Sequence, residues 1–215
     1  MHYRTASDDE GRIQAVDAKI LIDGGAYSSF GLVTTYYAGQ LLTGPYDFPA
    51  YSFDSTRVFT NKPPCGPKRG HGTPQPRFAL EVQLDKFAED LGLDPVELRL
   101  KHLMPPNTKA INHLTVTTIG LKECIEKVVE ASGFQERRKS LPLGKGLGLA
   151  CGAYLTGAGL PIYWNKMPHS GVQLKVDRGG GVTVFCGSTD IGQGSNSILA
   201  TIVAEEFGID PEHVI

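Results

Sequence analysis

The sequence predicts an α+β fold, in which mixed sheets pack against helices. Runs with apolar residues at every second position, typical of half-buried strands, occur near both ends of the 215-residue chain. Between them lie segments with apolar residues three and four positions apart, typical of amphipathic helices. No internal repeat or low-complexity segment is evident, which excludes a repeat architecture.

The first half of the chain contains predicted strands and helices in mixed order. In chain order we expect a strand over 16–23, a helix over 29–43, a strand over 51–60, and helices over 75–91 and 95–103. The first strand alternates Val16, Ala18 and Ile20 with polar residues, which indicates burial on one face. The last helix has Asp94 as a candidate N-cap and Pro95 at its first position.

The second half begins with a segment rich in Pro, Asn and Thr, over 104–120, which predicts a long loop. We then expect a helix over 121–132, strands over 146–154, 171–176 and 181–186, a hairpin turn over 177–180, and a helix from about 193 to 207. Val214 and Ile215 resemble the first residues of a further strand. We therefore divide the chain into a first part over 1–104, a linker and helix over 105–145, and a second part over 146–215.

Composition excludes several classes of protein. Hydrophobic residues make up 40% of the chain and charged residues 20%, which suits a globular protein with a buried core. The net charge of −2 argues against nucleic-acid binding, and no apolar run is long enough for a membrane span. The four cysteines are far apart in the sequence, so we expect neither an iron–sulfur nor a zinc site in this chain. We expect buried thiols in a reducing cytoplasm, and a disulfide is the open alternative.

A glycine-rich turn at 186–196 separates the last predicted strand from the last predicted helix. Backbone N–H groups at a helix start lack partners, and with the helix dipole they favour a phosphate or another anion. Gly192 and Gly194 would let a ligand approach the backbone, and the Gln193 amide can donate and accept. The alternative is a purely structural turn, since neither common phosphate-binding motif is matched.

A second segment, over 63–78, combines prolines, glycines and basic residues. It presents Lys68, Arg69 and His71 just before a predicted helix, in a loop that proline stiffens. A guanidinium beside an imidazole suits an oxyanion or an electron-rich ligand. The alternative is a solvated basic turn.

These segments resemble the molybdenum-binding subunit of the xanthine dehydrogenase and aldehyde oxidase family. Four stretches carry the resemblance: Arg-Gly-His-Gly-Thr-Pro-Gln at 69–75, Gly-Ser-Thr-Asp-Ile-Gly-Gln-Gly at 187–194, Asp-Pro-Val-Glu-Leu-Arg at 94–99, and Asp-Gly-Gly-Ala-Tyr at 23–27. Within the family, the stretches at 24–30, 36–40 and 44–46 most resemble the catalytic subunit of 4-hydroxybenzoyl-CoA reductases.

The resemblance implies a molybdenum-pterin cofactor, either molybdopterin or its cytosine dinucleotide form. It assigns cofactor contacts to Arg69, Gly70, His71 and Gly72 in the loop and to Gly192, Gln193 and Gly194 in the turn. In the family, pterin sulfurs and not side chains hold the metal, so we expect no protein ligand to molybdenum. We expect the loop and the turn to face one cavity, with the His71 imidazole near the substrate.

The implied reaction is reductive dehydroxylation of an aromatic acyl-CoA such as 4-hydroxybenzoyl-CoA. The alternative is oxidation of an aldehyde, a purine or another heterocycle with water as the oxygen source. Iron–sulfur clusters and FAD are expected on partner subunits of an oligomeric complex. The family's Gly-Glu-x-Pro segment, with its general-base glutamate, does not occur here, so no catalytic residue is assigned. We therefore expect an internal piece of a longer subunit, and a catalytically silent fragment or interaction module is the alternative of another class.

Two further features have open interpretations. An aromatic group lines either a channel for a flat substrate or the ordinary core; its members are Tyr27, Phe30, Tyr36, Tyr37 and Tyr46. The acidic run at 8–10 precedes a glycine, which predicts a solvated turn between strands in preference to a cation site.

Overall fold

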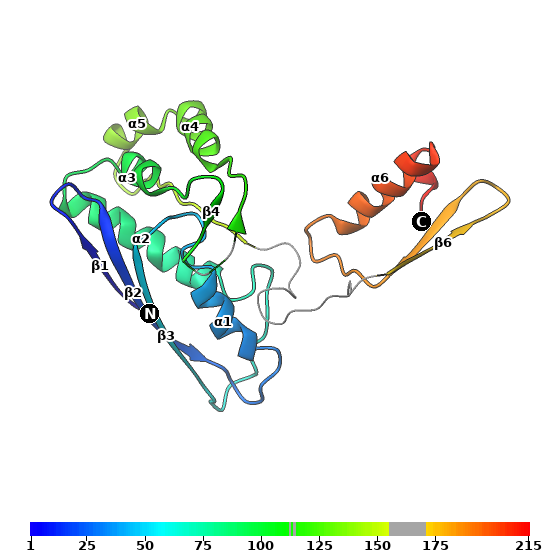
Figure 1. The fold of residues 1–215 in the computed structure, drawn as a ribbon, viewed down its shortest axis with the longest axis horizontal. Helices are drawn as coiled ribbons and strands as arrows, with labels where there is room; N and C mark the ends of the chain where they lie inside the picture. Colours follow the sequence, from blue (N-terminus) through cyan, green and yellow to red (C-terminus); the bar gives the residue numbers. More distant parts are fainter. Residues whose placement is uncertain (112, 114, 155–170) are drawn as a thin grey trace. The chain divides into compact units, whose positions relative to one another are not determined.

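The computed structural model describes residues 1–111, 113, 115–154 and 171–215. The chain divides into two compact units, Met1–Tyr154 and Leu155–Ile215 (Figure 1). Both contain strands and helices, which confirms the predicted α+β class. The three-part division at 104 and 145 stays a prediction, and its stretch at 155–170 lies outside the described residues.

The first unit contains a three-stranded sheet in the order β1 (His2–Ser7), β2 (Ile13–Asp23), β3 (Ala50–Val58). Strands β1 and β2 are antiparallel and are joined by the predicted acidic turn. Strands β2 and β3 are parallel, and the chain crosses between them through helix α1 (Leu32–Gln40) (Figure 1). The carboxyl ends of β2 and β3 therefore lie at the same edge of the sheet.

One face of this sheet packs on the core and the other faces solvent. Val16, Ala18 and Ile20 are buried, as their alternation predicts. Tyr51 and Phe53 lie beside Val16 and Ala18 in register, on the same face. Strand β1 is missed from the sequence because its partly buried positions hold mostly polar residues, so the period-two signal is weak.

Helices cover the inner face of the sheet. Helix α2 (Pro74–Asp90) buries Leu80, Leu84 and Ala88, and the Tyr3 hydroxyl of β1 donates to its Pro76 carbonyl at 3.0 Å. On α1, the carbonyl of Gly39 accepts from the Tyr51 hydroxyl at 2.9 Å. Both helices confirm the predicted segments, with α1 shorter than expected.

Helix α3 (Pro95–His102) begins as predicted, because the Asp94 carboxylate accepts from the amides of Val96 at 2.8 Å and Glu97 at 3.0 Å. Helix α4 (Leu121–Ser132) ends at Gly133, whose φ of 60° suits glycine. Short elements that the sequence did not predict complete the unit: β4 (Thr108–Lys109), β5 (Thr115–Val116), α5 (Phe134–Arg137) and the 3₁₀ helix η1 (Arg138–Ser140).

The predicted strand over 146–154 is wrong. This segment has no regular secondary structure, although Cys151 is buried in the core of the first unit. Its apolar residues pack against the core without a partner strand, which a periodic pattern cannot reveal.

The second unit, described by itself, is a hairpin with one helix. Strands β6 (Val172–Val176) and β7 (Val182–Cys186) are antiparallel, and helix α6 (Ser195–Phe207) follows, then the short 3₁₀ helix η2 (Pro211–His213). These confirm the predicted strands, turn and helix. The chain end pairs with β7 as the predicted further strand requires, because the Ile215 amide donates to the Val182 carbonyl at 2.9 Å.

A buried ion-pair network joins α2 to α3. The fully buried Arg99 guanidinium donates to the carboxylates of Glu81 and Asp85, both at 2.8 Å. The other Glu81 oxygen accepts from the Tyr46 hydroxyl at 2.8 Å. Desolvation is the largest single effect and opposes the charge of Arg99, but Glu81, Tyr46 and Asp85 together outweigh it and raise the pKa of Arg99 above its usual value.

Replacing Arg99 should therefore destabilise the first unit strongly. We expect Arg99→Met to cost about 3–5 kcal/mol, because it leaves the buried Glu81 carboxylate without its partner. Arg4→Met is the matched control, since the Arg4–Asp17 pair lies at the surface and exposed pairs contribute little. Urea denaturation followed by circular dichroism measures both, and equal losses would contradict the assignment.

Candidate functional site

The loop that carries Arg69 begins beside the carboxyl end of β2. The Cys65 amide donates to the Gly24 carbonyl at 3.2 Å, and the Ala26 amide donates to the Lys62 carbonyl at 2.8 Å. The Asp23 carboxylate accepts from Lys62 and from the Thr60 hydroxyl, each at 2.6 Å. These bonds, that of Lys62 foremost, lower the pKa of Asp23 to about 2 and anchor the base of the loop.

The Asp-Gly-Gly-Ala-Tyr stretch forms a tight loop between β2 and α1. Arg57 closes it, because its Nη2 atom donates to the carbonyls of Gly24 and Ser28, both at 3.0 Å. Tyr27 and Ser29 have φ angles of 45° and 44°, a left-handed conformation that is unfavourable for residues other than glycine. Sequence reasoning missed Arg57, which lies on β3, far along the chain from the loop it closes.

The predicted cofactor loop ends in a turn that leads directly into α2. The Thr73 amide donates to the Gly70 carbonyl at 2.8 Å. Gly70 and Gly72 have φ angles of 93° and 77°, which favour glycine. Arg69 lies at the exposed surface of this turn.

His71 points inward, in contrast to Arg69. It is only 8% exposed, and its Nε2 atom lies 2.8 Å from the Thr34 hydroxyl of α1. Its ring lies 5.7 Å from that of Phe30 and 5.4 Å from that of Tyr37. Burial lowers the pKa of His71, so the imidazole is neutral at pH 7. The expectation that the loop presents His71 together with its cations is therefore wrong.

The predicted aromatic group does not stay together in the structure. Tyr46 belongs to the core, where it stacks on Phe48 at 5.6 Å. Tyr37 is buried against His71, while the remaining members are exposed. Phe30 and Tyr37 contact the His71 ring, whereas Tyr46 lies in the core, so the five residues do not form one channel wall.

A cavity of about 400 Å³ lies next to the loop. Its lining includes Lys68 and Gly72 from the loop, Thr34 from α1, and Gln75 at the start of α2. The apolar part of the lining comes from β2 and the neighbouring helices: Ile20, Ile22, Ala38 and Pro76. An apolar wall with a few polar groups is typical of small-molecule sites.

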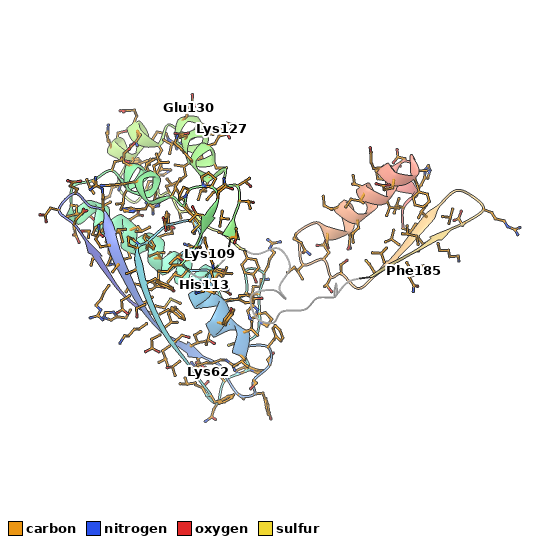
Figure 2. All side chains as sticks on the ribbon, in the orientation of Figure 1. Lys62, Lys109, His113, Lys127, Glu130 and Phe185 are labelled. Atoms are coloured by element: carbon orange, nitrogen blue, oxygen red, sulfur yellow. The ribbon has the colours of Figure 1, made fainter. Side chains whose placement is uncertain are left out.

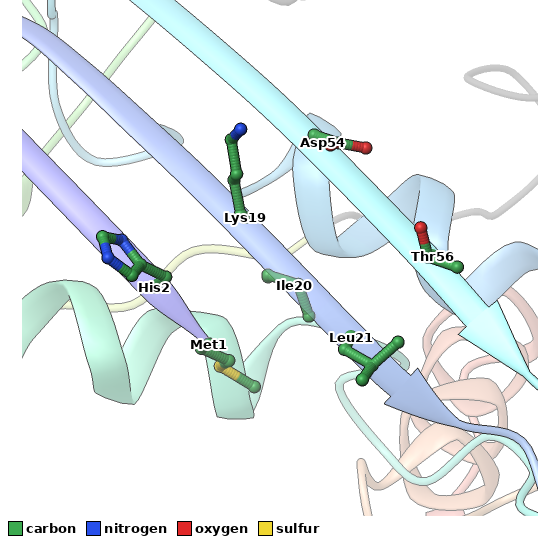
Figure 3. A pocket seen from close by; sticks show the side chains of 7 residues that line it. All are labelled: Met1, His2, Lys19, Ile20, Leu21, Asp54 and Thr56. Atoms are coloured by element: carbon green, nitrogen blue, oxygen red, sulfur yellow. The ribbon is translucent and has the colours of Figure 1, made fainter.

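A second hollow, of about 300 Å³, lies on the solvent-facing side of the sheet (Figure 3). Figure 3 shows Lys19 and Asp54 on neighbouring strands, in agreement with their register. This hollow contains none of the seven predicted cofactor-binding residues.

Asp190 organises the glycine-rich turn of the second unit. Its Oδ1 atom accepts from the Gly192 amide at 2.7 Å, and its Oδ2 atom accepts from the Asn196 amide at 3.2 Å. These bonds, that of Gly192 foremost, lower the pKa of Asp190. The expectation that the donors at the start of α6 are unpaired is therefore wrong for Gly192 and Asn196.

Gln193 also closes the turn on itself. Its Oε1 atom accepts from the Ile191 amide at 2.6 Å, and its Nε2 atom donates to the Thr189 carbonyl at 2.9 Å. The amide thus donates and accepts, as the sequence predicts, but within the turn. Gly192 and Gly194 have φ angles of 98° and 84°, which favour glycine at both positions.

Asp190 is the residue of this turn that sequence reasoning missed. An aspartate two residues before a glycine, just ahead of a helix, is a common signal for a side chain that binds nearby backbone amides. A carboxylate there also complements the positive end of the helix dipole. An anionic group of a ligand would meet a like charge at this turn.

The thiols differ from the prediction. All four described cysteines are free, but only Cys151 is buried, whereas Cys124 and Cys186 are exposed. Hydrogen bonds from Ser188 lower the pKa of Cys186, at the end of β7.

Among the described residues, no helix is both long and apolar enough to cross a membrane.

Sequence profiles of the molybdopterin cofactor-binding domain match residues 1–103 and 125–215. The four stretches that carry the resemblance, at 23–27, 69–75, 94–99 and 187–194, each lie inside one of the two matches. The chain belongs to the molybdopterin-binding domains of the xanthine dehydrogenase and aldehyde oxidoreductase family.

This chain is similar to part of several larger molybdopterin-binding chains. The xanthine dehydrogenase molybdenum-binding subunit of Escherichia coli O157:H7 is 31% identical over 206 residues, which cover 93% of this chain and 27% of that subunit. The quinoline 2-oxidoreductase of Pseudomonas putida 86 superposes with a TM-score of 0.82 at 28% identity, over 99% of this chain and 29% of that one.

The aldehyde oxidoreductase of Desulfovibrio gigas has a TM-score of 0.81 at 28% identity, over 99% of this chain and 24% of that one. The molybdopterin-binding chain described here thus spans about a quarter of the length of these relatives.

Gly72→Ala should destabilise the loop more than an equivalent change elsewhere. The new Cβ would lie 2.5 Å from the Thr34 carbonyl oxygen, whereas at Gly92, which also has a positive φ, it would meet nothing within 4 Å. Both variants carry the left-handed penalty of about 1–2 kcal/mol, and we expect Gly72→Ala to add about 1–3 kcal/mol of steric strain. Equal unfolding midpoints for the two variants would show that Gly72 and Thr34 are not in contact.

The buried His71 should give the stability a specific pH dependence. Its pKa is lower in the folded state than in the unfolded state, so the unfolded chain binds the proton first as the pH falls below about 6.5. Neutral His71 therefore contributes stability above that pH that is lost on acidification. We expect His71→Gln to flatten the stability profile between pH 7 and 5, and an unchanged slope would argue against burial.

Proposed function

We propose that this chain is the cofactor-holding part of a molybdenum-dependent oxidoreductase that oxidises an aldehyde or a nitrogen heteroaromatic ring. The observation that carries the proposal is the match of both units to molybdopterin cofactor-binding domains. The named relatives act on xanthine, quinoline or an aldehyde. When bound, a molybdenum-pterin cofactor supplies the redox centre for such reactions.

Reductive dehydroxylation of 4-hydroxybenzoyl-CoA has no support among the relatives named above. The resemblance of short stretches such as 24–30 includes no residue with a defined chemical task in that reaction. Oxidation with water as the oxygen source is therefore the better-supported function, and the acyl-CoA serves as a comparison substrate.

We assign the cofactor contacts to the seven residues of the loop and the turn: Arg69, Gly70, His71, Gly72, Gly192, Gln193 and Gly194. The chemistry of the loop fits the cofactor. Lys68 and Arg69 place two cations at the surface for its phosphate groups, and Gly70 and Gly72 adopt the left-handed backbone that the turn needs. Neutral His71 contributes packing, because it holds the loop against α1.

The remaining parts of the proposal concern the whole protein. We infer that iron–sulfur and FAD groups on partner subunits carry the electrons and that the complex works in the cytoplasm. The cited E. coli relative is itself a subunit by name, which supports a multi-subunit assembly.

The decisive experiment is analysis of the protein in the form that its host produces. Molybdenum is measured by mass spectrometry and pterin by fluorescence after oxidation. We expect both at close to one per protein chain. A preparation that turns over substrate but contains neither would end the proposal.

Arg69→Ala should weaken cofactor retention. Loss of one charge-assisted hydrogen bond costs about 1.5–3 kcal/mol, which corresponds to about a 10- to 150-fold loss of affinity. Lys127→Ala is the matched control, because Lys127 is an exposed cation on α4, away from the loop, next to Glu130 in Figure 2. Equal cofactor content in both variants would remove Arg69 from the site.

The substrate class is tested on the same preparation. Xanthine, quinoline and an aromatic aldehyde are offered with an artificial electron acceptor, and 4-hydroxybenzoyl-CoA with a low-potential donor. We expect turnover with at least one of the first three. Reduction of the acyl-CoA alone would favour dehydroxylation.

A further inference from the structure

We propose that Asp190 is a positioning residue that fixes the turn at 192–194 in the conformation that contacts the pterin cofactor. The cofactor contact rests on the proposed function, whereas the control of the turn by Asp190 stands on the structure alone. No side chain of the turn other than Asp190 bonds both to a glycine of the turn and to the backbone of α6 among the described contacts.

The first step of the argument is how one carboxylate joins two segments. The Oδ1 atom of Asp190 accepts from the amide of Gly192, in the glycine-rich turn. The Oδ2 atom accepts from the amide of Asn196, near the start of α6. The same Oδ2 atom accepts from the Ser195 hydroxyl at 3.4 Å. Asp190 therefore sets the distance between the turn and the start of the helix.

The second step is the coupling of Asp190 to Gln193. The Gln193 Nε2 atom donates to the Ser195 oxygen at 3.2 Å, and Ser195 in turn donates to Asp190. The Gln193 side chain is thus linked to Asp190 through the Ser195 hydroxyl. Loss of the carboxylate removes the acceptor of the Ser195 hydroxyl, so the oxygen that accepts from Gln193 is held less firmly.

The third step is the conformational cost of the turn. Gly192 and Gly194 adopt left-handed backbone conformations. Glycine can adopt many other conformations at little cost, so the sequence alone does not hold the turn in this one. Without the Asp190 carboxylate the turn would lose two backbone hydrogen bonds that select this conformer. An ordinary helix cap would stabilise α6 without affecting cofactor retention, and this difference makes the inference testable.

The chain offers a matched control in Asp177. Its carboxylate accepts from the amides of Gly179 at 2.8 Å and Gly181 at 3.0 Å in the β6–β7 turn. Asp177 thus closes a glycine-rich turn in the same way as Asp190 but outside the Gly-Gln-Gly segment. The variants compared are Asp190→Ala, Asp190→Asn and Asp177→Ala.

The first measurement is the amide nuclear magnetic resonance spectrum of the 215-residue chain with labelled glycine and asparagine. We expect the Gly192 and Asn196 amide protons to shift upfield in Asp190→Ala and to stay in place in Asp177→Ala. Asp190→Asn retains one acceptor oxygen, so it should preserve the Gly192 position and shift Asn196. Unchanged Gly192 and Asn196 signals in Asp190→Ala would overturn the control of the turn by Asp190.

The second measurement is the pterin content of the same variants made in the natural host. We expect about a 10- to 100-fold loss of cofactor affinity in Asp190→Ala, as for other residues that orient a ligand-binding group. Asp190→Asn should rescue it in part, and Asp177→Ala should match the unaltered protein. Equal pterin content in Asp190→Ala and Asp177→Ala would reduce Asp190 to a helix cap. Absence of pterin from the unaltered protein would instead refute the proposed function.

Discussion

The first unit depends on one buried cation. Arg99 is fully enclosed, and its charge is balanced by Glu81 and Asp85 of the neighbouring helix. A charge in that position is tolerable only while both helices and Tyr46 keep their places, because each supplies an acceptor or holds one. The network therefore fixes α2, and the loop that carries Arg69 leads directly into the first residue of that helix.

The secondary structure was predictable wherever a local pattern decides it. The alternation of Val16, Ala18 and Ile20 gave β2, and the Asp94–Pro95 pair gave the start of α3. Strand β1 and the irregular segment at 146–154 were not predictable, because their conformations depend on distant partners. The Tyr3 hydroxyl, for example, binds a carbonyl 73 positions away.

The candidate site was predictable in its residue types more than in its geometry. The glycines at 70, 72, 192 and 194 have left-handed backbones, which favour glycine at these positions. The orientation of His71 was hidden, because Thr34 is 37 positions earlier in the sequence. Asp190 gives a short-range signal, an aspartate two residues before a glycine, and its carboxylate binds the amide donors that a helix start would otherwise leave free.

The position of Cys186 has a practical consequence. This thiol is exposed, its pKa is lowered by Ser188, and it ends the strand that leads into the glycine-rich turn. Thiolates are the reactive form of cysteine and a lowered pKa favours them, so thiol-directed dyes and spin labels can attach to this exposed thiol. The protein thereby supplies a natural anchor for a fluorophore a few residues from Gln193, and the same reactivity makes it prone to cross-linking between copies in air.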